Sequence, residues 1–223
     1  MGRSAIYLYN TFCTIIDRAG DPSMEDYEFT QEFNLAALSV FKHRFGNDNL
    51  KDSQGNQQFA WEMTDTDAVK WQPLIVKKPT TCDGDGKVLI ATIEALLSGK
   101  IFHIRFDRKD TNGEYRYCRF VRHNDEGIQI QNDFKKPREL YPVWLAYNEY
   151  YELLPARATD VKFTAIKYPS EINLDFANPA NNKDTDLTDS VIDEVLWRMA
   201  SAFGVQIRDQ VLTENSLVQE KLQ

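Results

Sequence analysis

The histidines and cysteines are the residues that could supply nucleophilic or metal chemistry, and the chain contains three of each. No two of His43, His103 and His123 have the four-residue spacing that places two ligands on one face of a zinc-binding helix, and no Cys-x-x-Cys pair is present. Cys118 and His123 are close in sequence, but Cys118 falls within an alternating strand pattern, where a small buried thiol is common. We therefore expect no catalytic residue, no metal site and no cofactor.

The glycine-containing loop Asp83–Lys87, with the sequence DGDGK, resembles part of two ligand-binding motifs. A calcium-binding EF-hand loop needs further oxygen ligands at fixed offsets, where Lys87 and Leu89 stand. A phosphate-binding P-loop needs an earlier glycine and a Ser or Thr after Gly-Lys, where Val88 stands. The loop therefore predicts a mobile turn rather than a binding site.

Basic and aromatic residues allow an alternative function in nucleic-acid binding. The net charge is −8, and the Lys-Arg clusters at Val76–Pro79 and Phe134–Leu140 are short, whereas a groove that neutralises phosphates needs many clustered cations. An aromatic strand face with interleaved arginines could stack bases. Its members are Tyr115, Arg116, Tyr117, Arg119, Phe120 and Arg122. A function as a non-catalytic module that binds nucleic acid or a host protein therefore remains an alternative. An acidic surface is, however, better suited to letting DNA pass without adhering.

Cysteine usage and hydropathy indicate the compartment. The chain has an odd number of cysteines, and they lie far apart in sequence, at Cys13, Cys82 and Cys118. This pattern favours free thiols in a reducing environment. The first ten residues lack the apolar core of a signal peptide. No stretch approaches the roughly 20 apolar residues of a membrane helix, so we expect no membrane association.

The elements that must position these residues begin with two helices. Apolar residues recur at helical spacing in Ala5–Arg18, namely Ile6, Tyr9, Phe12, Cys13 and Ile16. Ser23 is a plausible N-cap for a second helix that ends at Gly46. The apolar face of that helix comprises Tyr27, Phe33, Ala37, Val40, Phe41 and Phe45. Residues 1–46 therefore predict an N-terminal helical hairpin.

Residues 47–177 predict a β-rich region that begins with a polar loop. Val88–Leu97 is apolar and fits either a strand or a helix. Asn112-Gly113 is a hairpin-turn signal between two alternating strands, the second running from Tyr115 to Val121. A short strand is predicted around Glu126–Ile130, and another at Glu139–Tyr147, where Pro142 favours an edge position in the sheet. Two more strands are predicted on either side of Pro155, at Tyr150–Leu154 and Val161–Tyr168.

Residues 178–223 predict a polar linker, a long C-terminal helix and a polar tail. Asp186 is a plausible N-cap, with Asp189 in the first turn. The helical stripe comprises Ile192, Val195, Leu196, Met199, Phe203 and Ile207. The three segments together predict one compact α+β domain, with a helical hairpin, a central antiparallel sheet and a long C-terminal helix.

Three stretches of the chain resemble virion structural proteins of crAss-like and related Bacteroidales tailed phages. The first is GDPSMEDYEFTQEFNLAALSVFKHRFG at Gly20–Gly46. The second is ELYPVWLAYNEYYELLPARATDVKFTAIKYPSEI at Glu139–Ile172, and the third is LTDSVIDEVLWRMASAFGVQIRDQVL at Leu187–Leu212. Residues 47–99 do not follow the family pattern. The matching features are packing patterns rather than catalytic signatures.

The resemblance implies a non-enzymatic function. Similar proteins form rings in the head-to-tail connector below the portal, where DNA passes, so the resemblance implies a virion protein that is made in the host cytoplasm. Its expected partners are further copies of itself, twelve in a ring, and the portal or adjacent connector and tail proteins. Such a subunit needs complementary surfaces on two sides. The expected subunit-contact residues are Trp197, Tyr141, Trp144 and Tyr168.

Overall fold

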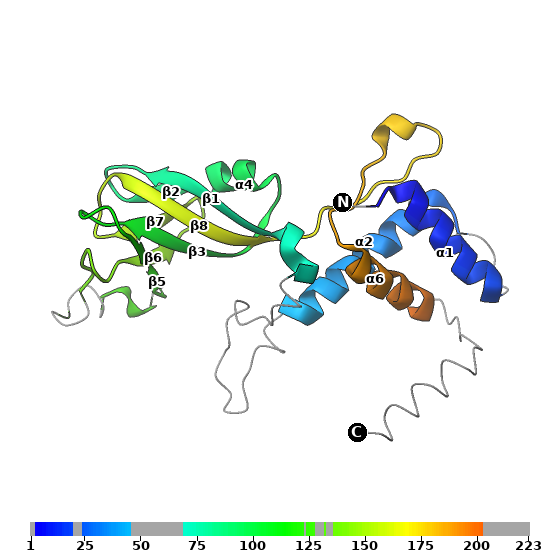
Figure 1. The fold of residues 1–223 in the computed structure, drawn as a ribbon, viewed down its shortest axis with the longest axis horizontal. Helices are drawn as coiled ribbons and strands as arrows, with labels where there is room; N and C mark the ends of the chain where they lie inside the picture. Colours follow the sequence, from blue (N-terminus) through cyan, green and yellow to red (C-terminus); the bar gives the residue numbers. More distant parts are fainter. Residues whose placement is uncertain are drawn as a thin grey trace, which may run out of the picture. The chain divides into compact units, whose positions relative to one another are not determined.

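The structure, a computed structural model, describes residues 3–19, 24–45, 69–122, 124–127, 132 and 136–202 of the chain. The chain divides into two compact units, which we name the helical unit (residues 1–70 and 169–223) and the β unit (residues 71–168). The α+β class is confirmed (Figure 1). The division differs from the expected single domain with segment boundaries after residues 46 and 177, because the chain that follows the last strand packs with the helices.

The described residues of the helical unit contain three α-helices, and each predicted helix is confirmed: α1 at Ala5–Ala19, α2 at Asp26–Phe45 and α6 at Asp189–Ala202. The ring of Phe29 joins α1 to α2, since its centroid lies 5.4 Å from that of Tyr9 and 5.9 Å from that of Phe12. On α6 the buried residues include Ile192, Val195, Leu196 and Met199, as the stripe predicts. The predicted Ser23 cap, Gly46, Phe203 and Ile207 lie outside the described residues.

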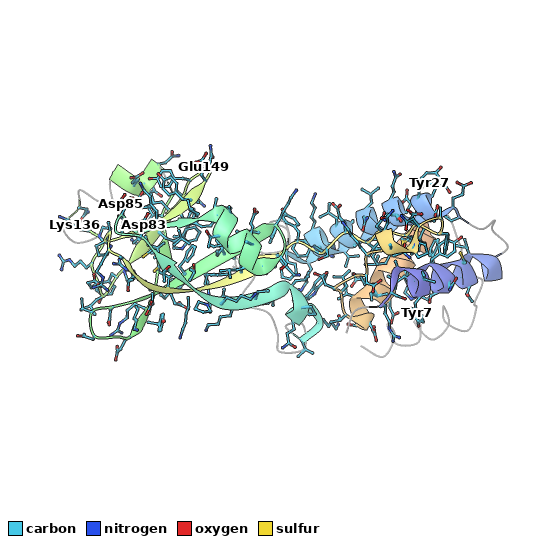
Figure 2. All side chains as sticks on the ribbon, turned by 90° about the horizontal axis from the view of Figure 1, so that it is seen from above. Tyr7, Tyr27, Asp83, Asp85, Lys136 and Glu149 are labelled. Atoms are coloured by element: carbon cyan, nitrogen blue, oxygen red, sulfur yellow. The ribbon has the colours of Figure 1, made fainter. Side chains whose placement is uncertain are left out.

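The buried faces of the first two helices differ in part from those expected. On α1 the buried residues are Ala5, Leu8, Phe12 and Ile16, whereas Ile6 is 41% exposed. On α2 the expected Tyr27 is exposed, and Phe29 is buried instead. Figure 2 shows Tyr7 and Tyr27 projecting from the surface of the helical unit. The helical period was correctly predicted, but the apolar residues outnumber the positions that a single buried face can hold.

An extended segment at residues 172–176 is bound along α2 by side chains spaced four residues apart. Asn34 binds both the N–H (2.9 Å) and the C=O (3.1 Å) of Ile172. Thr30 Oγ1 accepts from the N–H of Leu174 (3.1 Å), and Asp26 Oδ2 accepts from the N–H of residue 176 (3.2 Å). Four helical residues rise about 6 Å and two extended residues about 6.6 Å. The two spacings match, so this segment belongs to the helical unit.

The start of α6 is fixed by contacts that differ from the predicted cap. The helix begins at Asp189, and the C=O of Thr188 accepts from the N–H groups of Val191 and Ile192. The carboxylate of Asp186 accepts instead from the backbone and hydroxyl of Ser170, so its prediction as the N-cap is wrong. Arg3 forms two hydrogen bonds to the carboxylate of Asp189, at 2.9 and 2.8 Å, and thereby joins the starts of α1 and α6.

The described residues of the β unit form two four-stranded sheets. Their strands are β1 (Ile75–Cys82), β2 (Lys87–Leu89), β3 (Ile101–Lys109), β4 (Tyr115–Tyr117), β5 (Arg119–Phe120), β6 (Val143–Ala146), β7 (Tyr150–Leu154) and β8 (Thr159–Lys167). The first sheet has the order β1-β8-β3-β4 and is antiparallel. The second has the order β2-β7-β6-β5, and its β5–β6 pair is parallel. The strands predicted on either side of Pro155 are therefore confirmed, but they belong to different sheets.

Aromatic side chains from both sheets form the core of the β unit. The ring centroid of Phe106 on β3 lies 5.3 Å from that of Trp144 on β6 and 5.2 Å from that of Tyr151 on β7. Helix α4 (Ile90–Leu97) adds Ile93 and Leu97 to this core. The ambiguous stretch Val88–Leu97 thus ends strand β2 and then forms α4.

Two strand predictions in the β unit are wrong. Strand β6 is central in its sheet, not at an edge, because Pro142 precedes the strand and its C=O accepts from the N–H of Arg119 (3.0 Å). Residues 124–127 are helical rather than extended, and the remainder of that predicted strand, including Ile128 and Ile130, lies outside the described residues. The DGDGK loop is a turn between β1 and β2, in which Asp83 Oδ1 accepts from the N–H of Lys87 (2.7 Å).

Candidate functional site

The predicted arginine and aromatic strand passes from the edge of one sheet to the edge of the other. It divides at Cys118, whose side chain is fully buried and whose N–H donates to the C=O of Phe106 (2.9 Å). Before this residue, β4 is the edge of the first sheet; after it, β5 is the edge of the second. Tyr117 is 59% and Phe120 42% exposed. Very short edge strands offer little backbone for pairing with another strand, so the exposed aromatic rings are the groups at these two edges that can contact another chain.

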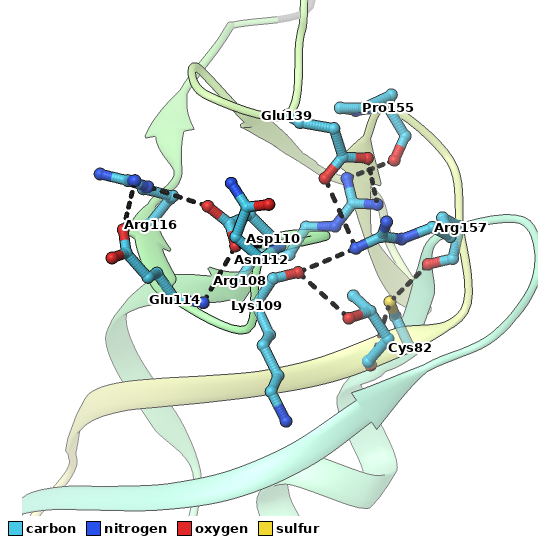
Figure 3. A network of polar contacts seen from close by, with 11 residues as sticks. Cys82, Arg108, Lys109, Asp110, Asn112, Glu114, Arg116, Glu139, Pro155 and Arg157 are labelled. Atoms are coloured by element: carbon cyan, nitrogen blue, oxygen red, sulfur yellow. Dashed lines mark hydrogen bonds and ion pairs between the residues drawn. The ribbon is translucent and has the colours of Figure 1, made fainter.

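The three arginines of this stretch have different surroundings. Arg116 binds Asp110, with Nε 3.2 Å from Oδ2, and also forms an ion pair with Glu114 (Figure 3). Burial opposes ionisation of Asp110, but hydrogen bonds from the backbone of Glu114 and from Arg116 hold its pKa below the ordinary value. The positive charge of Arg116 is therefore compensated within the turn. Arg119 and Arg122 have exposed side chains.

The four expected subunit-contact residues also differ in exposure. Tyr141 is 73% and Trp197 45% exposed, and Tyr168 is half-buried beside the ring of Phe102. Trp144 is only 7% exposed, because its ring packs against Phe106 and Tyr151 between the sheets. The ring of Trp144 therefore offers little surface to another subunit, and the contact role of all four residues remains a prediction.

Two exposed surfaces follow from these positions. We name the first the β5 edge patch; it comprises Tyr117, Arg119, Phe120, Arg122 and Tyr141, all exposed. Tyr141 adjoins it because the C=O of the next residue accepts from the N–H of Arg119. We name the second the α6 acidic patch; it comprises Asp193, Glu194 and Trp197, all exposed. Residues three and four apart share one face of a helix, so both carboxylates flank the indole of Trp197.

A buried arginine lies at the end of strand β3, in a position that the sequence analysis missed. Arg108 is 2% exposed, and its Nη1 donates to the C=O of Pro155. Its Nη2 lies 3.7 Å from Glu139 Oε1, and Arg157 Nη2 lies 3.4 Å from the other oxygen of the same carboxylate (Figure 3). We name these four residues the Arg108 cluster. Its sequence signal was present, because Ile104, Phe106 and Arg108 alternate on the inward face of one strand.

Two of the three cysteine thiols are buried in environments that suppress their reactivity. All three cysteines are free, and burial raises the pKa of Cys82 and raises that of Cys118 to about 12. Because the thiolate is the nucleophile, both thiols are inert near neutral pH. Burial, and then the nearby Arg105, lower the pKa of His103. His123 lies outside the described residues.

The described part of the chain contains no set of three or more His, Cys, Asp or Glu side chains placed to hold a metal ion. Within the described ranges, no helix combines the length and the apolar character needed to cross a bilayer.

Formal charge is divided unequally between the two units. The β unit contains 16 Lys and Arg against 13 Asp and Glu, which gives +3. The helical unit contains the remaining 10 basic and 21 acidic residues, which gives −11. The net charge of −8 therefore conceals one strongly acidic and one weakly basic unit. Opposite potentials on two parts of a chain favour contacts between unlike parts.

Comparison with protein-family models finds no match, and comparison with curated proteins also finds none. The evidence for a function of the candidate surfaces therefore comes from the residues that form them. Of the predicted residues, Arg119 and Tyr141 come together at the β5 edge patch, whereas Arg116 is paired with acidic neighbours and Trp144 is in the core.

Proposed function

We propose that this chain is a non-catalytic structural subunit that assembles with copies of itself into a ring of a phage head-to-tail connector. The observation that carries the proposal is the division of charge, −11 on the helical unit and +3 on the β unit. The resemblance of Gly20–Gly46, Glu139–Ile172 and Leu187–Leu212 to virion proteins supplies the biological setting. The expected ring has twelve copies.

The charge division supports a head-to-tail contact between copies. In an isologous contact the same patch meets itself, so two helical units facing each other would repel. In a head-to-tail contact the acidic helical unit of one copy meets the β unit of the next. Such a contact leaves a free surface at each end, and it closes into a ring when the rotation per subunit divides a full turn.

The net charge of −8 also suits the proposed location. DNA that moves through a ring must not adhere to its wall, and a net acidic surface repels phosphates. The proposal therefore includes portal and adjacent connector proteins as neighbours, with DNA passing close to the ring and binding to no specific site.

Electron microscopy and native mass spectrometry of the full chain test the proposal, alone and with its portal protein. We expect closed rings whose mass is a multiple of 25.8 kDa. If the chain stays monomeric under both conditions, or occurs in purified particles only as isolated monomers, the proposed function is wrong.

A second candidate function is nucleic-acid binding by the β5 edge patch, where exposed arginines alternate with aromatic rings. Stacking and phosphate contacts would then give an affinity that falls steeply with salt. Binding of single-stranded DNA that is lost in an Arg119→Gln/Arg122→Gln variant, in a protein that does not self-associate, would favour this function over the ring.

A further inference from the structure

The turn between β3 and β4 presents an asparagine–glycine pair to solvent. Asn112 and Gly113 are both exposed, and a Cβ added at Gly113 would meet no atom within 4 Å. Gly113 has φ of 88° and carries no side chain that could shield its own backbone nitrogen. An asparagine amide that is followed by such an open backbone nitrogen has the groups needed for deamidation, an intramolecular reaction of the chain with itself.

Deamidation at this pair requires water as its only co-reactant. The backbone nitrogen of Gly113 attacks Cγ of Asn112, so the N–Cγ bond forms and the Cγ–Nδ2 bond breaks. The proton lost by the attacking nitrogen leaves with the amide nitrogen as ammonia, and a cyclic succinimide remains. Water then opens the ring at either of its carbonyl groups, which gives aspartate or isoaspartate at position 112. No oxidation or reduction takes place.

Asp110 holds the attacking nitrogen and the N–H groups on either side of it (Figure 3). Its C=O accepts from the N–H of Gly113 (3.1 Å). Its Oδ1 accepts from the N–H groups of Asn112 (2.8 Å) and Glu114 (2.9 Å). The carboxylate is itself fixed, because Asp110 is 6% exposed and its Oδ2 accepts from Nε of Arg116 (3.2 Å). Every backbone N–H from residue 112 to residue 114 therefore donates to Asp110.

We propose that Asn112 is a deamidation site and that Asp110 limits the rate of the reaction in the folded chain. Attack on Asn112 requires the Gly113 nitrogen to lose the proton that it donates to Asp110. The reaction therefore proceeds from the opened turn, and the hydrogen bonds of Asp110 determine how often the turn opens. Removal of the Asp110 carboxylate should raise the rate on the order of 10-fold, which corresponds to about 1.4 kcal/mol for the loss of charge-assisted hydrogen bonds.

Peptide mass spectrometry of the full chain tests the proposal. The chain is incubated at mildly alkaline pH, either folded or in urea, and is then digested with trypsin. Cleavage after Lys109 and Arg116 releases residues 110–116, whose mass changes when the Asn112 amide becomes a carboxylate. The folded wild type should react more slowly than the chain in urea. Asp110→Ala should react faster than the wild type when folded but at the same rate in urea, where the turn is absent.

Two further variants separate the role of Asp110 from general effects. Asp160→Asn removes a carboxylate that pairs with Lys109 at the end of β3 but takes part in no hydrogen bond of the turn, so the rate should stay as in the wild type. Arg116→Gln keeps the Asp110 carboxylate but removes its guanidinium partner, so the rate should rise by a smaller factor than in Asp110→Ala. Hydrogen exchange at the amides of β3 and β8 shows whether each variant remains folded.

Each outcome supports or overturns one part of the proposal. If Asn112 does not react in urea, it is not a deamidation site. If the folded wild type reacts as fast as the chain in urea, the turn does not protect the site. If Asp110→Ala stays folded and reacts no faster than the wild type, Asp110 does not limit the rate. If Asp110→Ala unfolds the β unit, the folded Arg116→Gln variant must react faster than the wild type, and an unchanged rate there would overturn the role of Asp110.

Discussion

Replacing Glu139 with glutamine should destabilise the β unit by about 2–3 kcal/mol. Arg108 is 2% exposed, and the Glu139 carboxylate lies 3.7 Å from its Nη2. Unit charges at that distance attract by about 4.5 kcal/mol at an effective dielectric constant of about 20, and by about 1 kcal/mol in water. Because the Glu139 side chain is 34% exposed, the expected loss lies between these values. The variant leaves a buried guanidinium without its counter-charge.

Hydrogen exchange at the amides of β3 and β8 measures this loss within the β unit itself, and urea unfolding of the full chain provides a second value. The matched control is Asp160→Asn, which breaks an ion pair with Lys109. In that pair the Asp160 side chain is 56% exposed and the Lys109 side chain is 39% exposed. It should cost less than about 1 kcal/mol. Arg108→Met should cost less than Glu139→Gln, because it removes the buried charge itself. If Glu139→Gln costs no more than Asp160→Asn, the Arg108 cluster does not stabilise the fold as argued.

Three further predictions concern the backbone, pH and DNA. Gly86→Ala should lower the free energy of unfolding in urea by about 2–4 kcal/mol, because Gly86 has φ of 79° and an added Cβ would overlap the carbonyl oxygen of Leu153. The control Gly113→Ala, with φ of 88° and open space around the added Cβ, should lower it by only about 1 kcal/mol. Equal losses in the two variants would refute the overlap. The melting temperature should fall as the pH rises above about 9. Burial raises the pKa of Cys118 and of Tyr151 to about 12 in the folded chain, so the unfolded chain loses these protons at lower pH and is stabilised relative to the folded chain. A constant or rising melting temperature would contradict this. Gel-shift assays at physiological salt should show no sequence-specific DNA complex, given the net charge of −8, and a nanomolar specific site would overturn the expectation.

Local patterns in the sequence determined most of the elements. The 3.6-residue period placed α1, α2 and α6, and Asn112-Gly113 marked the turn between β3 and β4, where Gly113 has positive φ. Pro155 separated two strands as expected. These features depend on residues close in sequence, through side-chain periodicity and the allowed backbone angles of glycine and proline. Such rules operate within a few residues of the chain and need no long-range contact.

The pairing of strands was decided by contacts distant in sequence. The regular stretch from Tyr150 to Phe176 contributes β7 to one sheet and β8 to the other, and its last residues bind along α2. Local alternation predicts a strand but not its neighbours, because neighbours are chosen by the fit of whole faces. For the same reason the expected strand from Tyr115 to Val121 divides at Cys118, where the chain leaves one sheet for the other.

Burial of individual side chains was likewise decided by the tertiary structure. Trp144 and Trp197 both follow apolar neighbours in sequence, yet one is 7% and the other 45% exposed. Arg108 is buried because Pro155 and Glu139, distant in sequence, supply an acceptor and a counter-charge at its position. The net charge was readable from composition, but its division became visible only once folding had assigned residues 169–223 to the helical unit. Composition adds charges without regard to position, whereas the field at a surface depends on which residues the fold places together.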